Sequence, residues 1–253
     1  MTHNILIVGT TYLNSPSKVE LLRIWSGLVD RNSPGCDVVV IDSASPIRAI
    51  DRLPAFDEVM IEDGDIPRLE GCNTVFRFTE DIGHPIVSRN PSRDFMKGLE
   101  IAIENGYDYV VHWETDCLFS RGVSEIVEKM ARSGVEVAAP FEANQQFIET
   151  QLIFFSVPYL KKSGFVNKYK RAYKPKEIFS ELCVELLCDK EIFILPLRGM
   201  RNNFNLLTPD NMGLVFRHGI DWLSHCDDFG CYVEFLRMNE VCGHENPDSH
   251  LPR

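Results

Sequence analysis

The sequence predicts a single α/β domain with a mostly parallel central sheet flanked by helices. The chain opens with a strand, a helix and a second strand, and short apolar runs then alternate with helical segments. A β-α-β unit of this kind implies a right-handed crossover between parallel strands. No internal repeat, low-complexity segment or obvious linker divides the 253 residues. A compact domain of this length buries about 70–75% of its unfolded surface, so its core needs no disulfide bonds or structural metal to be stable.

The opening unit is defined by apolar runs and by the residues that end them. Residues 4–9 (NILIVG) and 37–41 (DVVVI) are β-rich apolar runs, which suit buried strands of a parallel sheet. Between them, residues 18–28 place apolar side chains at helical spacing, and the NSPG sequence at 32–35 ends that helix. Ligands of such sheets bind beyond the carboxyl ends of the strands. The polar residues after the two strands, 10–12 and 42–43, should therefore face one crevice.

The later elements continue the alternation. A helix is predicted over 93–104, with Ser92 as its N-cap and an apolar side. The strand at 107–113 delivers Glu114, Thr115 and Asp116 to the carboxyl edge of the sheet, and a helix over 124–133 ends at Gly134. From Arg198 onward the chain is predicted to be rich in loops. The remaining predictions are strands at 57–61, 74–78, 135–139, 151–156 and 191–195, and a helix at 177–188.

Composition excludes several classes of protein. Net charge is −11, which argues against nucleic-acid binding, and the apolar runs are too short to span a membrane. The first residues lack the basic start of a signal peptide, so we expect a cytoplasmic protein whose eight cysteines are mostly reduced. The basic stretch over 161–176 is interleaved with aromatic residues. It indicates either a solvated loop or helix face, or a mobile segment that meets an anionic ligand or the acceptor.

The tripeptide Glu114-Thr115-Asp116 is the strongest chemical signal in the chain. It places two carboxylates directly after a buried strand, where they repel each other unless a cation or hydrogen-bond donors compensate them. Mg²⁺ and Mn²⁺ favour carboxylate oxygens and often bridge them to the phosphates of a ligand. The E-x-D motif alone is common in acidic chains, so its value as evidence for a metal site depends on the residues around it.

Those surroundings resemble a known family. Residues 88–122, SRNPSRDFMKGLEIAIENGYDYVVHWETDCLFSRG, follow the pattern of GT-A glycosyltransferases, and family-2-like members are the closest comparison. The pattern is an arginine at a helix start, a glycine, an acidic-aromatic strand, D-x-D and a turn ended by glycine. The resemblance extends more loosely over residues 4–195. It implies a GT-A-like domain over 1–253, with a nucleotide-binding half at 1–117 and an acceptor-binding half with a C-terminal loop region at 118–253.

The resemblance also implies a binding site for a nucleotide-sugar donor, with a UDP- or GDP-sugar expected. Thr10, Tyr12 and Asp42 match nucleoside contacts, and a carboxylate such as Asp42 is suited to accept hydrogen bonds from a base or ribose. Arg93 matches an arginine that meets a phosphate or the base, and Lys97 lies one turn later on the same helix face. The alternatives for these residues are strand-end caps and surface charges.

The metal and the catalytic base are implied in the same way. Asp116 takes the place of the direct metal ligand, and Glu114 stands where the family usually has Asp, with a metal or ribose role. A third ligand is expected from a C-terminal histidine, His218 in preference to His225. Glu181 is the candidate base that takes the proton of the acceptor hydroxyl, although the family's Glu-Asp pair is absent. Glu142 is the next candidate.

The sequence thus predicts a glycosyltransferase that uses Mn²⁺ or Mg²⁺ and acts on a glycan or another hydroxyl acceptor. Two alternatives stay open. One is a nucleotidyltransferase, which would release pyrophosphate from a nucleoside triphosphate, although no P-loop or dinucleotide-binding glycine motif is present. The other is a catalytically silent binding module on the same fold, which the altered Glu114 allows.

Overall fold

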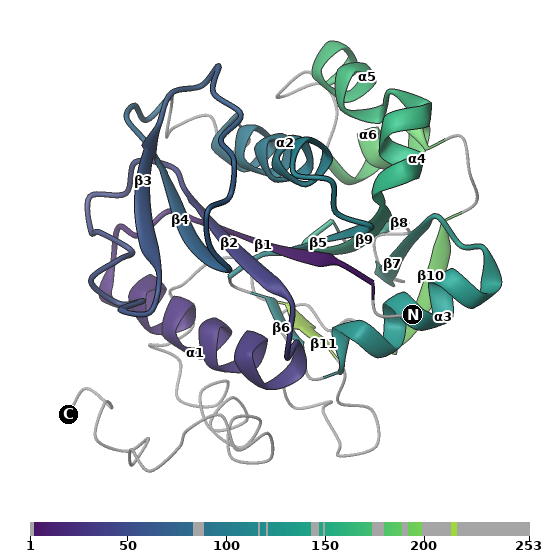
Figure 1. Ribbon diagram of the computed structural model, residues 1–253, viewed down its shortest axis with the longest axis horizontal. Coiled ribbons are helices and arrows are strands. Elements are labelled where there is room, and N and C mark those ends of the chain that lie inside the picture. The colour runs from purple at the N-terminus through teal and green to yellow at the C-terminus, as the bar shows by residue number, and fades with distance from the viewer. Residues whose placement is uncertain are drawn as a thin grey trace.

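A mixed β-sheet forms the middle layer of the protein, and helices cover both of its faces (Figure 1). The computed structural model describes residues 3–82, 89–115, 117–119, 121–142, 147–148, 150–173, 180–188, 192–198 and 214–216. Within them the strands run in the order β10-β7-β9-β5-β1-β2-β4-β3, and β8 pairs with β7. The strands of this sheet are β1 (Ile5–Thr11), β2 (Asp37–Asp42), β3 (Asp57–Ile61), β4 (Asn73–Phe78), β5 (Tyr109–Trp113), β7 (Val137–Glu142), β8 (Phe147–Ile148), β9 (Leu152–Ser156) and β10 (Phe193–Arg198).

The predicted mostly parallel sheet is confirmed. Strand β1 lies between β2 and β5 and is parallel to both, and the pairs β2–β4, β3–β4 and β7–β10 are also parallel. Strands β8 and β9 are the exceptions, because β9 runs antiparallel to β5 and β7, and β8 runs antiparallel to β7. Only residues 143–151 separate β7 from β9, and a connection this short between neighbouring strands reverses the chain direction.

Helices α1 (Pro16–Asn32) and α3 (Val123–Ser133) cover one face of the sheet (Figure 1). The Ser15 hydroxyl caps α1 by accepting a hydrogen bond from the backbone N–H of Lys18. Trp25 of α1 packs so closely on β1 that a Cβ at Gly9 would lie 2.6 Å from its ring. Gly134, with a φ of 65°, ends α3 as predicted.

The opposite face is covered by α2 (Arg89–Glu104), α4 (Val157–Ser163), α5 (Phe165–Ala172) and α6 (Ser180–Leu187) (Figure 1). The prediction that Ser92 caps α2 is wrong, because the helix begins at Arg89 and Ser92 lies inside it. Pro91 is tolerated there, since the first turn of a helix leaves its N–H groups without helical partners. Gly98 brings α2 into close contact with β1, where a Cβ would lie 2.4 Å from Cγ1 of Val8.

The described part of the basic stretch lies in the helices α4 and α5. Phe165 and Tyr169 are buried on the inner side of α5, whereas Lys161 and Lys162 of α4 and Lys168 of α5 are exposed. The helical periodicity places Phe165 against β9 and Tyr169 against α2, and it leaves the lysines in solvent. No helix in the described ranges is long and apolar enough to cross a membrane.

A small second sheet lies beside α1. It pairs β6 (Cys117–Phe119) with β11 (Leu214–Phe216) in antiparallel orientation, and Cys117 lies opposite Phe216. The sequence predicted neither strand. The pairing ties the chain just after Glu114-Thr115-Asp116 to a segment near residue 215.

Candidate functional site

The carboxyl ends of β1, β2, β4 and β5 meet at one edge of the sheet, which the sequence predicted for β1, β2 and β5. The chain leaves β1 for β2 on one side and later places β5 on the other side, so the strand order reverses at β1. Ligands of open α/β sheets bind in the crevice at such a switch point. Here the hydroxyl of Thr115 donates to the backbone oxygen of Thr10 at 2.9 Å, which joins the ends of β5 and β1.

The side chain of Thr10 is directed into the protein. Its hydroxyl lies 3.5 Å from Nε2 of His112, whose Nδ1 is 2.8 Å from the backbone oxygen of Thr150. The imidazole therefore donates through Nδ1–H and accepts through Nε2. Burial lowers the pKa of His112 to about 4, so the ring is neutral at neutral pH. Thr10 is 9% exposed, so little of its side chain is accessible to a ligand.

Asp42, the predicted nucleoside contact, is fully buried at the end of β2. Its Oδ1 accepts the backbone N–H of Ser45 at 2.8 Å, and its Oδ2 lies 3.6 Å from Nη1 of Arg77. No hydrogen-bond donor among the described residues reaches Oδ2. Burial raises the pKa of the Asp42 carboxyl, which Ser45 and Arg77 partly counteract. One carboxylate oxygen thus fixes the loop after β2, and the other has unused capacity to accept.

Tyr12 lies half-buried after β1 at the same edge. Its hydroxyl donates to Oδ2 of Asp81 at 3.2 Å, and Nζ of Lys18 lies 5.5 Å from its ring centre. Burial raises the pKa of Tyr12, and the charges of Asp81 and Asp42 add to this effect. The aromatic ring therefore lies among charged groups at the sheet edge where β1, β2 and β4 end.

Arg93 and Lys97 are buried rather than exposed on the helix surface. The guanidinium of Arg93 lies 3.7 Å from the ring centre of Phe78, and its Nη1 donates to the backbone oxygen of Glu80 at 3.0 Å. Its Nη2 has no hydrogen-bond partner in the described part of the chain. Lys97 donates to the backbone oxygen of Asp63 at 2.8 Å, and burial lowers its pKa. Both residues hold the loops that follow β3 and β4.

Arg93 and Lys97 line a pocket of about 320 Å³ between these loops and the helices α2 and α5. Lys170 of α5 closes one side of it and pairs with Glu100 of α2. A second pocket, of similar volume, shares Arg93 and lies over the ends of β3 and β4. Nη2 of Arg93 is itself buried, so an anionic or carbonyl-bearing ligand group in either pocket would bind it only after the side chains that cover it move.

Asp94 is a further candidate site residue, which the sequence did not predict. It is 2% exposed, accepts a hydrogen bond from the Ser43 hydroxyl, and lies 3.5 Å from Nε of Arg93. Burial raises its pKa to about 7. A signal was present, because Asp94 precedes Gly98 and Ile101 in one helical row that faces the sheet. A carboxylate within the apolar side of a helix is seldom only a surface charge.

Glu114 lies at a tight turn after β5, and its side chain is half-buried. Its backbone N–H donates to the oxygen of Gln151 at 2.8 Å, and its carbonyl accepts from the N–H of Cys117 at 3.0 Å. Asp116, the predicted metal ligand, lies outside the described residues, as do His218 and His225. Among the residues that are described, no three His, Cys, Asp or Glu side chains come together in a way that could hold a metal ion.

The two candidate bases are placed only by their backbones. Glu181 lies in the first turn of α6 and Glu142 ends β7, and the side chains of both lie outside the described part. Glu185, one turn after Glu181, accepts the backbone N–H of Ile148 at 2.7 Å. Because β8 pairs with the end of β7, this contact places α6 near the carboxyl edge of the sheet.

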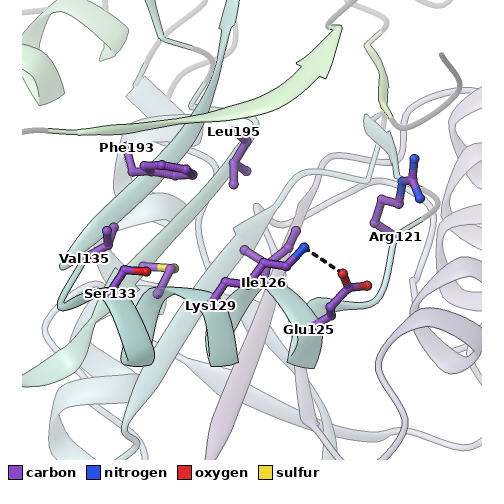
Figure 2. A pocket seen from close by; sticks show the side chains of 9 residues that line it. Arg121, Glu125, Ile126, Lys129, Ser133, Val135, Phe193 and Leu195 are labelled. Atoms are coloured by element: carbon purple, nitrogen blue, oxygen red, sulfur yellow. Dashed lines mark hydrogen bonds and ion pairs between the residues drawn. The ribbon is translucent and has the colours of Figure 1, made fainter.

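A third pocket lies elsewhere, between α3 and the edge strand β10, and has a volume of about 410 Å³. Figure 2 shows apolar side chains such as Ile126 and Leu195 on its walls and the ion pair of Glu125 and Lys129 on its rim. None of the predicted site residues lines it, so it is separate from the crevice at the switch point.

Comparison with known proteins identifies the fold but no sequence family. No protein-family model matches the chain, and no curated protein matches its sequence. Among solved structures, the WbbM bifunctional glycosyltransferase matches with a TM-score of 0.64 at 10% identity over 96% of this chain. The match covers 50% of the WbbM chain, so this chain spans half of that protein's length.

A second similar structure is the galactosyltransferase LgtC in complex with donor and acceptor sugar analogues. It matches with a TM-score of 0.56 at 12% identity, over 96% of this chain and 98% of LgtC. An active-site mutant of LgtC matches with the same TM-score at 13% identity and the same coverage. At these identities the matches show a shared architecture, so the chain has a GT-A-like fold.

Proposed function

We propose that the chain is a metal-dependent glycosyltransferase that moves a sugar from a UDP- or GDP-sugar to a hydroxyl of a glycan or another acceptor. The motif pattern favours the family-2-like group of these enzymes. The observation that carries the proposal is the position of Glu114. Its turn follows β5 directly at the switch point of a GT-A-like sheet, and Thr115 ties that turn to the end of β1.

The nucleotide would lie across the ends of β1, β2 and β4. Tyr12 offers an aromatic ring and Asp42 an acceptor oxygen, and these are the groups that stack on a base and bind its N–H or a ribose hydroxyl. Arg93 offers an unpaired donor to a phosphate. Because Oδ2 of Asp42 and Nη2 of Arg93 are both buried, binding requires displacement of the groups that cover them.

The divalent ion would be held by Glu114 and Asp116, with His218 as a third ligand. The pairing of β6 with β11 supports this set, since Cys117 follows Asp116 and lies opposite Phe216, which precedes His218 by two residues. Carboxylate oxygens and an imidazole suit Mn²⁺ or Mg²⁺. When bound, the ion would offset charge that develops on the departing nucleoside diphosphate.

Glu181 would act as the base toward the acceptor. The contact between Glu185 and Ile148 anchors α6 near the carboxyl edge of the sheet, and Glu181 lies one turn earlier in that helix. A carboxylate there can take the proton of an acceptor hydroxyl while the sugar is attacked from the opposite face. Arg93 would contribute positive charge on the side of the leaving diphosphate.

Calorimetric titration of UDP and GDP, with and without MnCl₂, tests this function. We expect binding that requires the metal and that is lost in Asp116→Asn. The matched control is Glu128→Gln, which changes an exposed carboxylate on α3 and should leave binding intact. Metal-independent binding, or unchanged affinity in Asp116→Asn, would remove the metal assignment. Release of pyrophosphate from a nucleoside triphosphate would instead identify a nucleotidyltransferase.

A further inference from the structure

A buried cluster of charged side chains ties the loop after β2 to the beginning of α2. Asp94 lies at its centre. Its Oδ2 accepts the Ser43 hydroxyl, and its Oδ1 lies 3.5 Å from Nε of Arg93. Ser43 and Asp94 are 51 positions apart in the sequence, so this contact fixes two distant segments at the same edge of the sheet.

The loop that Asp94 holds also organises its neighbours. Asp42 accepts the backbone N–H of Ser45, and the Ser45 hydroxyl accepts the backbone N–H of Leu13 at 2.7 Å. Ala44, between them, has a φ of 58°, a conformation that residues other than glycine rarely adopt. Such a conformation persists only where the surrounding contacts hold it, and it is found most often at functional sites.

The charge on Asp94 is costly in this place. Burial raises the pKa of its carboxyl to about 7, while Arg93 from the same helix lowers it and Asp42 at the end of β2 raises it. Arg77 of β4 forms an ion pair with Asp42. His112 of β5, which packs against α2, is neutral and adds no charge near Asp94. A neutral side chain of similar size would avoid this desolvation cost. Stability therefore does not account for a carboxylate at this position.

We propose that Asp94 is a positioning residue of the nucleotide pocket: through Ser43 it holds the loop after β2 in the conformation that receives the nucleoside. This rests on the function proposed above. The ionised carboxylate binds the hydroxyl more strongly than the acid does, because charge-assisted hydrogen bonds are stronger. Nucleotide affinity should therefore rise with pH as Asp94 loses its proton.

The test is calorimetric titration of UDP and GDP with MnCl₂ at about pH 6 and about pH 8, bracketing the pKa of Asp94. Asp94→Asn should weaken binding about tenfold at the higher pH and reduce the rise in affinity seen in the wild type. Ser43→Ala should do the same, and the double variant should bind no more weakly than either single variant. Glu104→Gln, at the exposed end of the same helix, should match the wild type.

The outcomes separate this proposal from the proposed function. If the wild type binds a nucleotide and Asp94→Asn binds equally well with the same pH dependence, the positioning role is refuted. If the effects of Asp94→Asn and Ser43→Ala add independently, the two residues do not act through their contact, and the proposal also fails. If the wild type binds neither nucleotide, the proposed function fails, and amide hydrogen exchange of residues 42–47 tests the restraint by Asp94 on its own. Exchange should be faster in Asp94→Asn than in the wild type, and equal exchange would refute the positioning role.

Discussion

Replacing Gly98 by alanine should destabilise the protein, although alanine is the better helix former. A Cβ at this position would lie 2.4 Å from Cγ1 of Val8 and 3.1 Å from its Cβ and Cγ2. Val8 is buried in β1 and has few alternative rotamers, so α2 must move away from the sheet. Overpacking of this kind costs about 1–3 kcal/mol, and the gain in helix propensity returns about 1 kcal/mol. We therefore expect a net loss of up to about 2 kcal/mol.

Urea unfolding of four proteins measures this effect: the wild type, Gly98→Ala, Val8→Ala and the double variant. In the Val8→Ala background both Cγ atoms are absent and only the 3.1 Å contact with Cβ remains, so adding Gly98→Ala should cost less than it does in the wild type. Gly64→Ala, which meets no atom within 4 Å, is the uncrowded control. An equal loss in both backgrounds, or a more stable Gly98→Ala single variant, would refute the packing argument. Because α2 carries Arg93 and Asp94, the single variant should also bind nucleotide more weakly.

Three further predictions concern buried or catalytic groups. The pKa of His112 is lowered to about 4, so its contribution to stability is complete above about pH 6.5 and is lost as the pH falls toward 4. His112→Gln should remove about 3 kcal/mol of pH dependence from urea unfolding in that range, and an unchanged profile would contradict the burial of a neutral ring. The pKa of Asp94 is raised to about 7, so its contribution is present at low pH and is lost as the pH rises through 7. Asp94→Asn should gain up to about 4 kcal/mol relative to the wild type between about pH 4 and pH 7; a difference that does not vary with pH would show that Asp94 titrates normally. Glu181→Gln should spare nucleotide binding and lower sugar transfer at least about a hundredfold, and an unaffected transfer rate would remove Glu181 as the base.

Most of the fold was accessible from the sequence because each element carries a local signal. The apolar runs of β1 and β2, the NSPG turn after α1 and Gly134 after α3 all mark structure that depends on nearby residues. The direction of β9 carries no such signal, since an apolar run has the same appearance in either orientation. The predicted N-cap at Ser92 is wrong for a related reason. A serine before an apolar helical segment has the pattern of a cap, whereas the helix begins earlier, at Arg89, and continues through Pro91.

The site was predictable as a location more than as a set of contacts. Strand ends gave Thr10, Tyr12, Asp42 and Glu114, and parallel pairing brings them to one edge. The sequence could not show that Asp42 is fully buried, because that depends on Arg77 and on a loop of distant residues. Asp94 was not predicted because the resemblance over residues 88–122 implies a role for Arg93 and none for the residue after it.

Turnover of a nucleotide sugar tests the central claim most directly. Purified wild type and Asp116→Asn are incubated with a panel of UDP- and GDP-sugars, with MnCl₂ or with EDTA, and the released nucleoside diphosphate is measured. We predict slow release from at least one nucleotide sugar by the wild type, only with the metal, and none by Asp116→Asn. Release that is absent across the panel, or equal in Asp116→Asn, would contradict a metal-dependent glycosyltransferase built on the turn after β5.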